Sequence, residues 1–325
     1  MSNLEKEPPE VELDSGPRAT DSVDILEPRD VPLGGPRAMT VRRTLPQRHR
    51  SLIGAWCFVD HYGPDLVADR GGMVVPPHPH TGLQTVSWLF AGEIDHRDSV
   101  GSHAPVRVGE LNLMTAGSGI AHSEVSTDAT TVLHGAQLWL ALPDASRHTA
   151  PAFEHYAPPA VEFGGATIRV FLGSLAGRTS PALAFSPIVG AQIDLAPHAS
   201  VELPVDAGFE HGVLLDTGSL TVDGEHVPAA HLAYRKPGSG VLRLEAGRDG
   251  ARLLLIGGLP FGESIIMWWN FIGRTHDEIV RFREQWQTDV VGGVRDDGRF
   301  GIVAGYPGRP LPAPELPGVR LKPRG

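Results

Sequence analysis

Two short fragments of the chain carry side chains that commonly bind metals: His78-Pro79-His80 and His122-Ser123-Glu124. In each fragment, two ligand-type residues occupy positions i and i+2. On a β-strand these positions share one face and lie roughly 7 Å apart along the strand. If both fragments are strands of one small barrel with those faces inward, three imidazoles and one carboxylate converge on a point. The spacing therefore predicts a metal site in which coordination positions remain open.

The donor set narrows the choice of metal. Imidazole nitrogen and carboxylate oxygen without thiolate suit Fe(II), Mn(II), Ni(II), Cu(II) or Zn(II). Three nitrogens and one oxygen on one side of an octahedron leave two adjacent positions free, which is how non-haem iron binds dioxygen and a substrate together. A closed structural zinc site is the alternative, but tetrahedral zinc of that kind prefers thiolate ligands.

The composition is that of an ordinary soluble globular protein. Among 325 residues, 41% are hydrophobic and 20% are charged, and this length is enough for two domains with real cores. The 39 glycines and 29 prolines favour many short strands over long helices. We find no apolar run of about 18 residues, so no membrane span is expected.

The net charge and the cysteine content bear on nucleic-acid binding and on the cellular compartment. The net charge of −10 argues against a nucleic-acid-binding surface. The basic stretch Arg42, Arg43, Arg48 and Arg50 stands against that trend and is interpreted as a solvated strand edge or loop. Cys57 is the only cysteine, and the first residues lack the features of a signal peptide, so we expect a cytoplasmic protein.

Alternating and apolar segments predict two sets of strands. We divide the chain into an acidic disordered tail (1–22), an N-terminal metal-binding barrel (23–145), a linker (146–165), a C-terminal barrel without metal (166–272), and a helix with a proline-rich extended tail (273–325). Strands are expected at 39–44, 55–59, 84–90, 93–96, 110–115, 134–142, 167–172, 213–215, 219–222 and 251–256. The segments 84–90 and 93–96 look like the two arms of a hairpin.

A faint internal repeat relates the two sets of strands. The segment 87–94 resembles 213–220, which places Gly92 opposite Gly218, and 113–119 resembles 234–240. The repeat puts Pro204 and Asp206 at the positions of the first histidine pair. It likewise puts Arg243 and Glu245 at the positions of His122 and Glu124. Proline and arginine do not bind metals, so we expect the second barrel to be empty.

The C-terminal region contains one convincing helix signal. Thr275-His-Asp-Glu278 has the spacing of a capping box, and Ile279, Phe282 and Trp286 then fall on one face. The pair His276 and Glu278 is a poor ligand pair, because positions i and i+2 of a helix point apart. Six prolines from residue 301 onward exclude a further helix or a central strand.

With these motifs, the chain resembles the pirin family. The resemblance lies in His78-Pro-His80-Thr-Gly-Leu-Gln-Thr-Val, in Met114-Thr-Ala-Gly-Ser-Gly-Ile-Ala-His122-Ser-Glu124, and in Phe58-Val-Asp-His-Tyr-Gly-Pro64. It implies a fold of the cupin superfamily: all-β, with two stacked jelly-roll-type barrels. It also implies that His78, His80, His122 and Glu124 are the metal ligands, usually of iron, and that the second barrel holds no metal.

One position departs from the family pattern. Many pirins carry glutamate four residues after the second histidine, where this chain has Gln84. We expect Gln84 to leave the metal in place but to remove a carboxylate that could act as a base near it. Asp60 and His61 are candidates to orient a ligand imidazole, with a polar turn as the alternative. The predicted hairpin also involves His96, Arg97, Asp98 and His103; we interpret these residues as a solvated loop, with a hairpin that overhangs the barrel mouth as the alternative.

The resemblance supports two functions of different classes. The first is a dioxygenase: some pirins cleave the flavonol quercetin with dioxygen, and Glu124 would then be the base that takes the substrate's hydroxyl proton. The second is a metal- and redox-dependent regulatory protein that acts through protein partners, as animal pirins do. A metal-free structural bicupin is a third reading.

Overall fold

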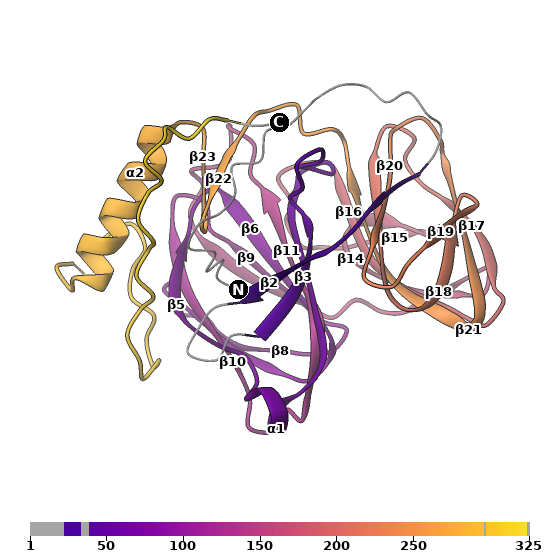
Figure 1. The fold of residues 1–325 in the computed structure, drawn as a ribbon, viewed down its shortest axis with the longest axis horizontal. Coiled ribbons are helices and arrows are strands. Elements are labelled where there is room, and N and C mark those ends of the chain that lie inside the picture. The colour runs from indigo at the N-terminus through magenta and orange to yellow at the C-terminus, as the bar shows by residue number, and fades with distance from the viewer. Residues whose placement is uncertain (1–22, 34–38, 296, 324–325) are drawn as a thin grey trace.

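The computed structural model describes residues 23–33, 39–295 and 297–323. The acidic tail expected over residues 1–22 lies outside these ranges. The described residues form mainly β-structure, arranged as two barrels side by side with a helix at one end (Figure 1). This confirms the predicted fold class. Within the same ranges, none of the helices combines the length and the apolar character needed to cross a bilayer.

The first barrel is built from two antiparallel sheets of the described residues. The larger sheet has the order β12 (Ala152–Tyr156), β9 (Leu111–Thr115), β6 (Leu83–Ala91), β11 (Val132–Ala141), β4 (Trp56–Leu66), β3 (Met39–Leu45) and β2 (Arg29–Leu33). The smaller sheet has the order β5 (Val74–His80), β10 (Ile120–Ser126), β7 (Ile94–Asp98) and β8 (His103–Val106). A single helical turn, α1 (Val67–Arg70), follows β4.

The second barrel repeats the strand order of the larger sheet. Its path runs β1 (Asp24–Leu26), β20 (Leu232–Arg235), β18 (Glu210–Val222), β21 (Val241–Gly258), β16 (Ile188–Leu195), β14 (Ala166–Leu175) and β13 (Val161–Phe163). Three short strands pair alongside: β15 (Arg178–Thr179), β17 (Ser200–Pro204) and β19 (Glu225–Val227). Gly92 and Gly218 have the same left-handed backbone, with φ of 89° and 86°. This equivalence fits the internal repeat.

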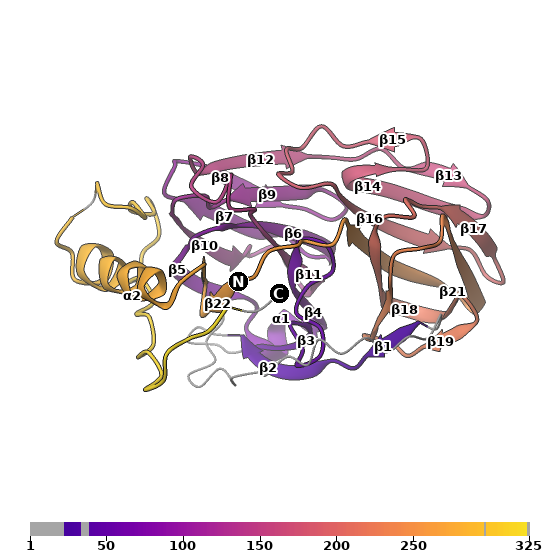
Figure 2. The same ribbon diagram turned by 90° about the horizontal axis from the view of Figure 1, so that it is seen from above.

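Two short edge strands complete the barrels: β1 completes the second barrel and β12 completes the first. The N-terminal strand β1 pairs with β20 of the second barrel, so Leu26 lies opposite Leu232. Strand β12, which follows the first barrel in sequence, pairs with β9 of that barrel (Figure 2). The segment 146–165, expected to be a linker, thus contains β12 and β13. The residues at which one barrel ends and the other begins stay a prediction.

A common apolar core joins the barrels. Trp56 and Trp88 of the first barrel pack with Phe171 and Leu254 of the second in one buried cluster. The Trp88 and Phe171 rings lie 4.7 Å apart. This shared core explains why the two barrels form one body, because separating them would expose several large apolar side chains to water.

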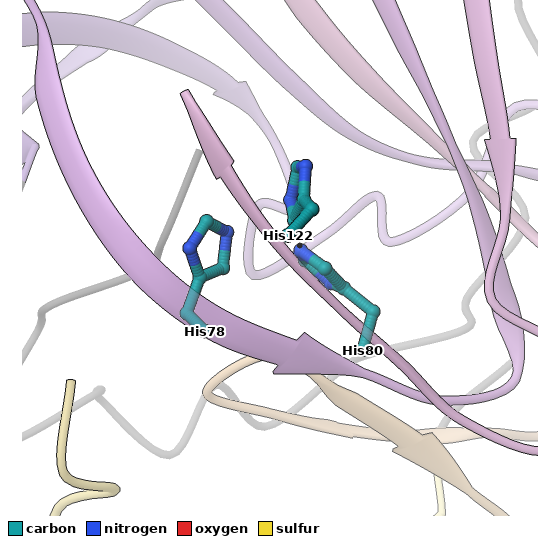
Figure 3. Close-up of side chains that lie close together, drawn as sticks. All are labelled: His78, His80 and His122. Atoms are coloured by element: carbon teal, nitrogen blue, oxygen red, sulfur yellow. Dashed lines mark hydrogen bonds between the residues drawn. The ribbon is translucent and has the colours of Figure 1, made fainter. Parts of the chain in front are cut away.

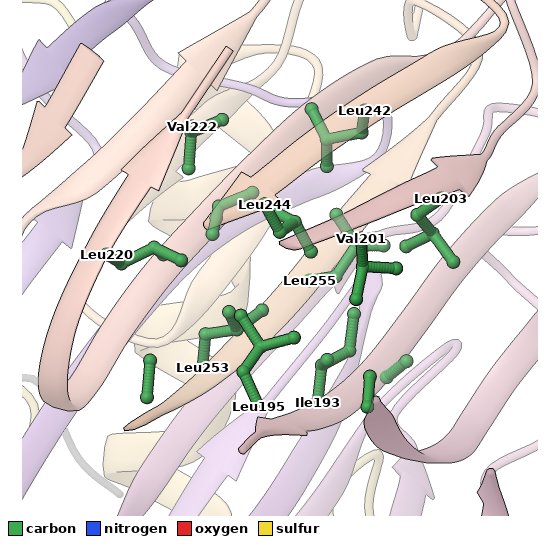
Figure 4. Packing of buried hydrophobic residues seen from close by; sticks show 14 of the residues in the cluster. Ile193, Leu195, Val201, Leu203, Leu220, Val222, Leu242, Leu244, Leu253 and Leu255 are labelled. Atoms are coloured by element: carbon green, nitrogen blue, oxygen red, sulfur yellow. The ribbon is translucent and has the colours of Figure 1, made fainter. Parts of the chain in front are cut away.

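The interior of the second barrel is filled with aliphatic side chains (Figure 4). Val201 and Leu203 of β17 lie directly opposite Leu244 and Leu242 of β21, and all four are buried. The repeat register was wrong at this point. Pro204, Asp206, Arg243 and Glu245, which it placed at the ligand positions, are all exposed. The positions that do face inward carry leucine and valine, which cannot bind a metal.

The predicted hairpin over 84–96 is also wrong. Strand β6 pairs with β9 and β11 in the larger sheet, whereas β7 pairs with β8 and β10 in the smaller sheet. The backbone turns away at Gly92, where φ is 89° and an added Cβ would lie 2.6 Å from the Val132 carbonyl oxygen. A short gap between two strands therefore marks a change of sheet here.

The predicted C-terminal helix is confirmed. Thr275 caps α2 (His276–Gln285), and its hydroxyl accepts a hydrogen bond from the Glu278 backbone at 3.2 Å. Glu278 completes the capping box and is engaged by Arg147, so it is unavailable as a metal ligand. The helix continues as a π-helical turn, η1 (Trp286–Val291).

The C-terminal segments cover the outer face of the small sheet. The hairpin β22 (Ile266–Trp268) and β23 (Phe271–Gly273), the helix α2 and the tail pack around Ala121 of β10. The Leu311 backbone N–H donates to the Pro77 carbonyl of β5 at 2.8 Å, and the Trp286 indole donates to the Leu311 carbonyl at 2.8 Å. Because β5 is an edge strand, this strap closes an edge that would otherwise be free.

Candidate metal centre

The two histidine-bearing strands lie side by side, as the spacing predicted. In the antiparallel pair β5–β10, His122 lies directly opposite His78. The side chains of His78, His80, His122 and Glu124 are 0–1% exposed. Three prolines in β5 are compatible with its place at the sheet edge, where missing N–H groups cost no ladder bonds.

The three imidazoles gather at one point inside the first barrel (Figure 3). Their ring centroids lie 4.3–5.1 Å apart. The Nε2 atoms of His80 and His122 are 3.1 Å apart, a separation that two ligands of one cation also show when each bond is about 2.0–2.1 Å long. His78 donates through Nδ1 to the Pro76 carbonyl at 2.8 Å, and its buried Nε2 has no partner.

Glu124 reaches the same cluster from the other side of His122. The ladder between β10 and β5 shifts register between His122 and Glu124. On the other side of β10, the ladder with β7 is regular and places Glu124 opposite His96. The Glu124 carboxylate groups with the ring nitrogens of His96 and His122 within 4.8 Å. The structure thus brings the three histidines together as one triad and joins Glu124 to them through His122.

Two polar side chains hold the Glu124 carboxylate. The Ser87 hydroxyl lies 3.2 Å from Glu124 Oε1 and 2.9 Å from Gln137 Oε1. One hydroxyl proton cannot serve two acceptors, and the buried Gln137 Nε2 has no partner. Rotating the Gln137 amide by half a turn exchanges its oxygen and nitrogen and resolves both conflicts. Gln137 then donates to Ser87, and Ser87 donates to Glu124.

Burial keeps the candidate ligands in the protonation state that a metal needs. Desolvation lowers the pKa of His78 to about 3 and lowers the pKa of His80 and of His122 well below the usual value. Neutral imidazoles have a lone pair to offer a cation. The unpartnered Nε2 of His78 and the nitrogen-oxygen donor set together fit a divalent transition metal at this point.

Gln84 does not belong to the centre, contrary to expectation. Its amide donates to the Thr115 hydroxyl and to the Leu183 carbonyl, both at 2.9 Å. Along β6, Ser87 faces the barrel interior and contacts Glu124, so Gln84 points to the opposite face, toward the second barrel. The absence of a glutamate at position 84 therefore removes no base from the metal centre.

Asp60 and His61 do not orient a ligand imidazole either. Asp60 forms a buried two-point ion pair with Arg43, at 2.7 and 2.8 Å. Arg42 donates to the Gly63 carbonyl, and Arg50 lies over the Tyr234 ring with Glu210 at 3.6 Å. Arg43 is buried and Arg42 and Arg50 are partly buried, so the interpretation of this stretch as a solvated strand edge or loop is wrong for these three.

His61 belongs to a second cluster between the barrels. Its Nε2 and that of His134 lie 2.7 and 2.6 Å from Asp216 Oδ1, and Arg252 donates to Asp216 Oδ2 at 2.5 Å. The Arg252 guanidinium also faces His134 Nδ1 at 3.5 Å, and His61 Nδ1 has no partner. Metal-binding histidines normally donate through the second ring nitrogen. These contacts therefore fit a hydrogen-bonded junction between the barrels better than a metal site.

His96 was misassigned from the sequence. It is 2% exposed on β7, within the barrel, whereas the hairpin interpretation put it on a solvated loop. The signal that could have identified it is the alternation His96-Arg97-Asp98, which places His96 and Asp98 on the same face of a strand. Arg97, by contrast, is partly exposed and His103 is exposed, and both pair with Asp95.

The buried neutral histidines predict acid sensitivity of the metal-free protein. Burial lowers the pKa of His61 and His78, and burial together with Arg235 lowers the pKa of His211 to about 4. In the unfolded chain these groups take up protons near pH 6.5, whereas in the folded chain they take them up only at lower pH. Stability should therefore fall as the pH drops below about 6.5, by about 1.4 kcal/mol per pH unit for each histidine.

Chemical unfolding of the metal-free protein between pH 7.5 and 4.5 measures this effect. The slope of the free energy of unfolding against pH reports how many protons the chain takes up on unfolding. The variant His211→Gln should lower that number by about one, whereas His226→Gln, at an exposed position, should leave it unchanged. A free energy of unfolding that stays level from pH 7 to pH 5 would contradict the prediction.

Comparisons with known proteins place the chain among relatives with two such barrels. Residues 38–140 match the family model described as pirin, and residues 190–292 match the pirin C-terminal cupin domain. A Pseudomonas aeruginosa protein named "Putative quercetin 2,3-dioxygenase" is 44% identical over 290 residues, which are 89% of each chain. A pirin-like protein of Caulobacter vibrioides is 36% identical over 258 residues, 76% of this chain and 88% of its own.

A solved structure shows the same fold. The crystal structure of a quercetin 2,3-dioxygenase from Acinetobacter baumannii superposes with a TM-score of 0.85 at 39% identity, covering 92% of this chain and 97% of that chain.

Proposed function

Because this chain belongs to the pirin family of bicupins, we propose that it is a non-haem metal protein that acts as a dioxygenase of the quercetin 2,3-dioxygenase type. Its metal is Fe(II), held in the first barrel by His78, His80, His122 and Glu124. Its substrate is a flavonol or a related small aromatic compound. The relatives named for quercetin 2,3-dioxygenase activity support the substrate class.

The observation that carries the proposal is the convergence of three neutral, buried imidazoles beside one carboxylate. A set of nitrogen and oxygen donors without sulfur is typical of non-haem iron sites with open positions. When bound there, Fe(II) would supply open coordination positions and the redox chemistry that activates dioxygen. The buried barrel interior supplies the exclusion of bulk water.

The residues around the site have separate tasks in this proposal. Glu124 takes the proton of the flavonol hydroxyl, and the Ser87 hydrogen bond fixes the direction of its carboxylate. The Tyr62 hydroxyl is buried without a partner, and burial raises the pKa of Tyr62, so it remains protonated as a donor toward a bound substrate. Trp139 packs edge-on against His80 at 5.1 Å and stacks on Phe58 at 4.0 Å, which holds one wall of the site.

Dioxygen consumption tests the proposal. Protein loaded anaerobically with Fe(II), and in parallel with Ni(II) or Mn(II), should consume dioxygen on addition of quercetin, with matching loss of the flavonol absorbance. Glu124→Gln should lower the rate by about 10²-fold or more, since general base catalysis typically contributes 10²–10⁴-fold. Glu110→Gln is the matched control, because it makes the same change at a partly exposed residue that directly precedes β9.

The metal content of each variant separates binding from chemistry. Protein that holds the metal but consumes no dioxygen with any of these ions would overturn the dioxygenase assignment and favour the metal-dependent regulatory protein instead. Protein that holds no metal would overturn both.

A further inference from the structure

Behind the ligand His122 lies a second buried imidazole. The Nδ1 atoms of His122 and His96 are 3.4 Å apart, and His96 Nε2 lies 3.2 Å from Asp98 Oδ2. The His96 side chain is 3% exposed and that of Asp98 is 0% exposed. His96 therefore lies between the buried Asp98 carboxylate and the Nδ1 edge of the His122 ring, whereas the Nε2 edge of His122 faces His80.

Backbone N–H groups hold the Asp98 carboxylate in place. Asp98 Oδ1 accepts hydrogen bonds from the N–H groups of Val100 at 3.1 Å and Ser102 at 2.9 Å. The His96 ring stacks on Phe153 of β12, with centroids 4.8 Å apart and planes 26° apart. Asp98 thus keeps only Oδ2 for His96, and His96 has little freedom to rotate.

These contacts dictate where the protons sit. Asp98 Oδ2 can only accept, so His96 must carry its proton on Nε2 and leave Nδ1 as an acceptor. His122 then carries its proton on Nδ1, directed at His96, and its Nε2 lone pair is left facing His80. The opposite arrangement would turn the lone pair of His96 Nε2 against a carboxylate oxygen in a buried site, which is unfavourable.

We propose that Asp98 and His96 are positioning residues that fix the tautomer and ring orientation of His122 through an Asp98–His96–His122 relay. The relay keeps His122 Nε2 free of a proton, so that its lone pair is always directed at the cation. It also raises the basicity of His122, because the buried carboxylate polarises both rings. This inference rests on the proposed metal centre.

The sharpest test is Asp98→Asn, which changes one end of the relay and little else. The side-chain oxygen still accepts from Val100 and Ser102, but an amide NH₂ now faces His96 Nε2. His96 must then carry its proton on Nδ1, and His122 must move its proton to Nε2, where it blocks coordination. We expect the affinity for Ni(II) or Co(II), measured by competition with a chelating dye, to fall by about 10–100-fold.

A matched pair at position 96 tests the acceptor itself. In His96→Asn the side-chain oxygen occupies the place of Nδ1 and can still accept from His122, whereas His96→Leu offers no acceptor. We expect His96→Asn to retain most of the affinity and His96→Leu to lose it, with a matching shift in the ligand-field absorption of the Co(II)-loaded protein. His103→Gln, at an exposed position on the adjacent strand, should behave as the unchanged protein.

The outcomes separate this inference from the proposed function. An unchanged protein that binds no metal refutes the metal centre itself. A centre that binds, with Asp98→Asn within twofold of the unchanged affinity, refutes the relay. If Asp98→Asn fails to fold, as judged by thermal unfolding without metal, the position-96 pair decides: equal affinities of His96→Asn and His96→Leu refute the relay.

Discussion

Replacing His122 by alanine is expected to abolish tight metal binding, the largest single effect on the site. His122 is the one residue shared by the two groups of potential ligands, the histidine triad and the group with His96 and Glu124. Its loss removes one donor, opens a cavity beside His80 and leaves His96 without its partner. The affinity should therefore fall by more than the roughly 10–100-fold that losing a supporting partner costs.

Metal content after purification and the dissociation constant for Ni(II) or Co(II) measure the effect. His211→Ala is the matched control, because His211 is also a buried histidine, 2% exposed, but lies in the second barrel. The control should retain one metal ion per chain. Retention of metal by His122→Ala, with affinity within tenfold of the unchanged protein, would show that the cation sits elsewhere.

Breaking the Arg43–Asp60 pair is expected to destabilise the fold by about 3–5 kcal/mol, because one charge is left buried and uncompensated. The two side chains are 1% and 0% exposed. The Arg43 guanidinium also lies 4.2 Å over the Phe58 ring, which stacks on Trp139 beside His80. The pair therefore supports one wall of the metal centre as well as the junction of β3 and β4.

Chemical unfolding of Asp60→Leu measures the single effect, and the double variant Arg43→Met with Asp60→Leu tests its cause. The double variant should regain most of the lost stability, since replacing both charges by apolar groups of similar size removes the uncompensated charge. Glu202→Gln breaks the exposed pair with Arg243 and should cost about 0–1 kcal/mol. A double variant no more stable than Asp60→Leu would mean that shape, rather than charge, dominates at this position.

The local parts of the structure could be predicted from the sequence because local rules set them. The i, i+2 spacing of His78 and His80, the capping box at Thr275 and the strand-forming segments each depend on neighbours a few residues away. The fold class followed from such segments together with the family resemblance. The ligand strands were therefore found without any knowledge of how they pair.

Which face each strand turns to the centre could not be read in the same way. Gln84 follows His80 by four residues, but the turn between them passes through Gly82, where φ is 68°, so the alternation of β5 does not carry over into β6. The family resemblance put Gln84 near the metal, whereas the structure puts Ser87 of the same strand there.

The sequence by itself determined the kinds of donor and the strands that carry them. Tertiary structure alone decided that His96 and Asp98 lie behind His122, that β1 completes the second barrel and β12 the first, and that His61 contacts Asp216 across the junction. Each of these contacts links residues whose separation is set by strand pairing rather than by chain distance. The alternation of side chains along a strand shows which residues share a face, but only the assembled sheets show which residues that face packs against.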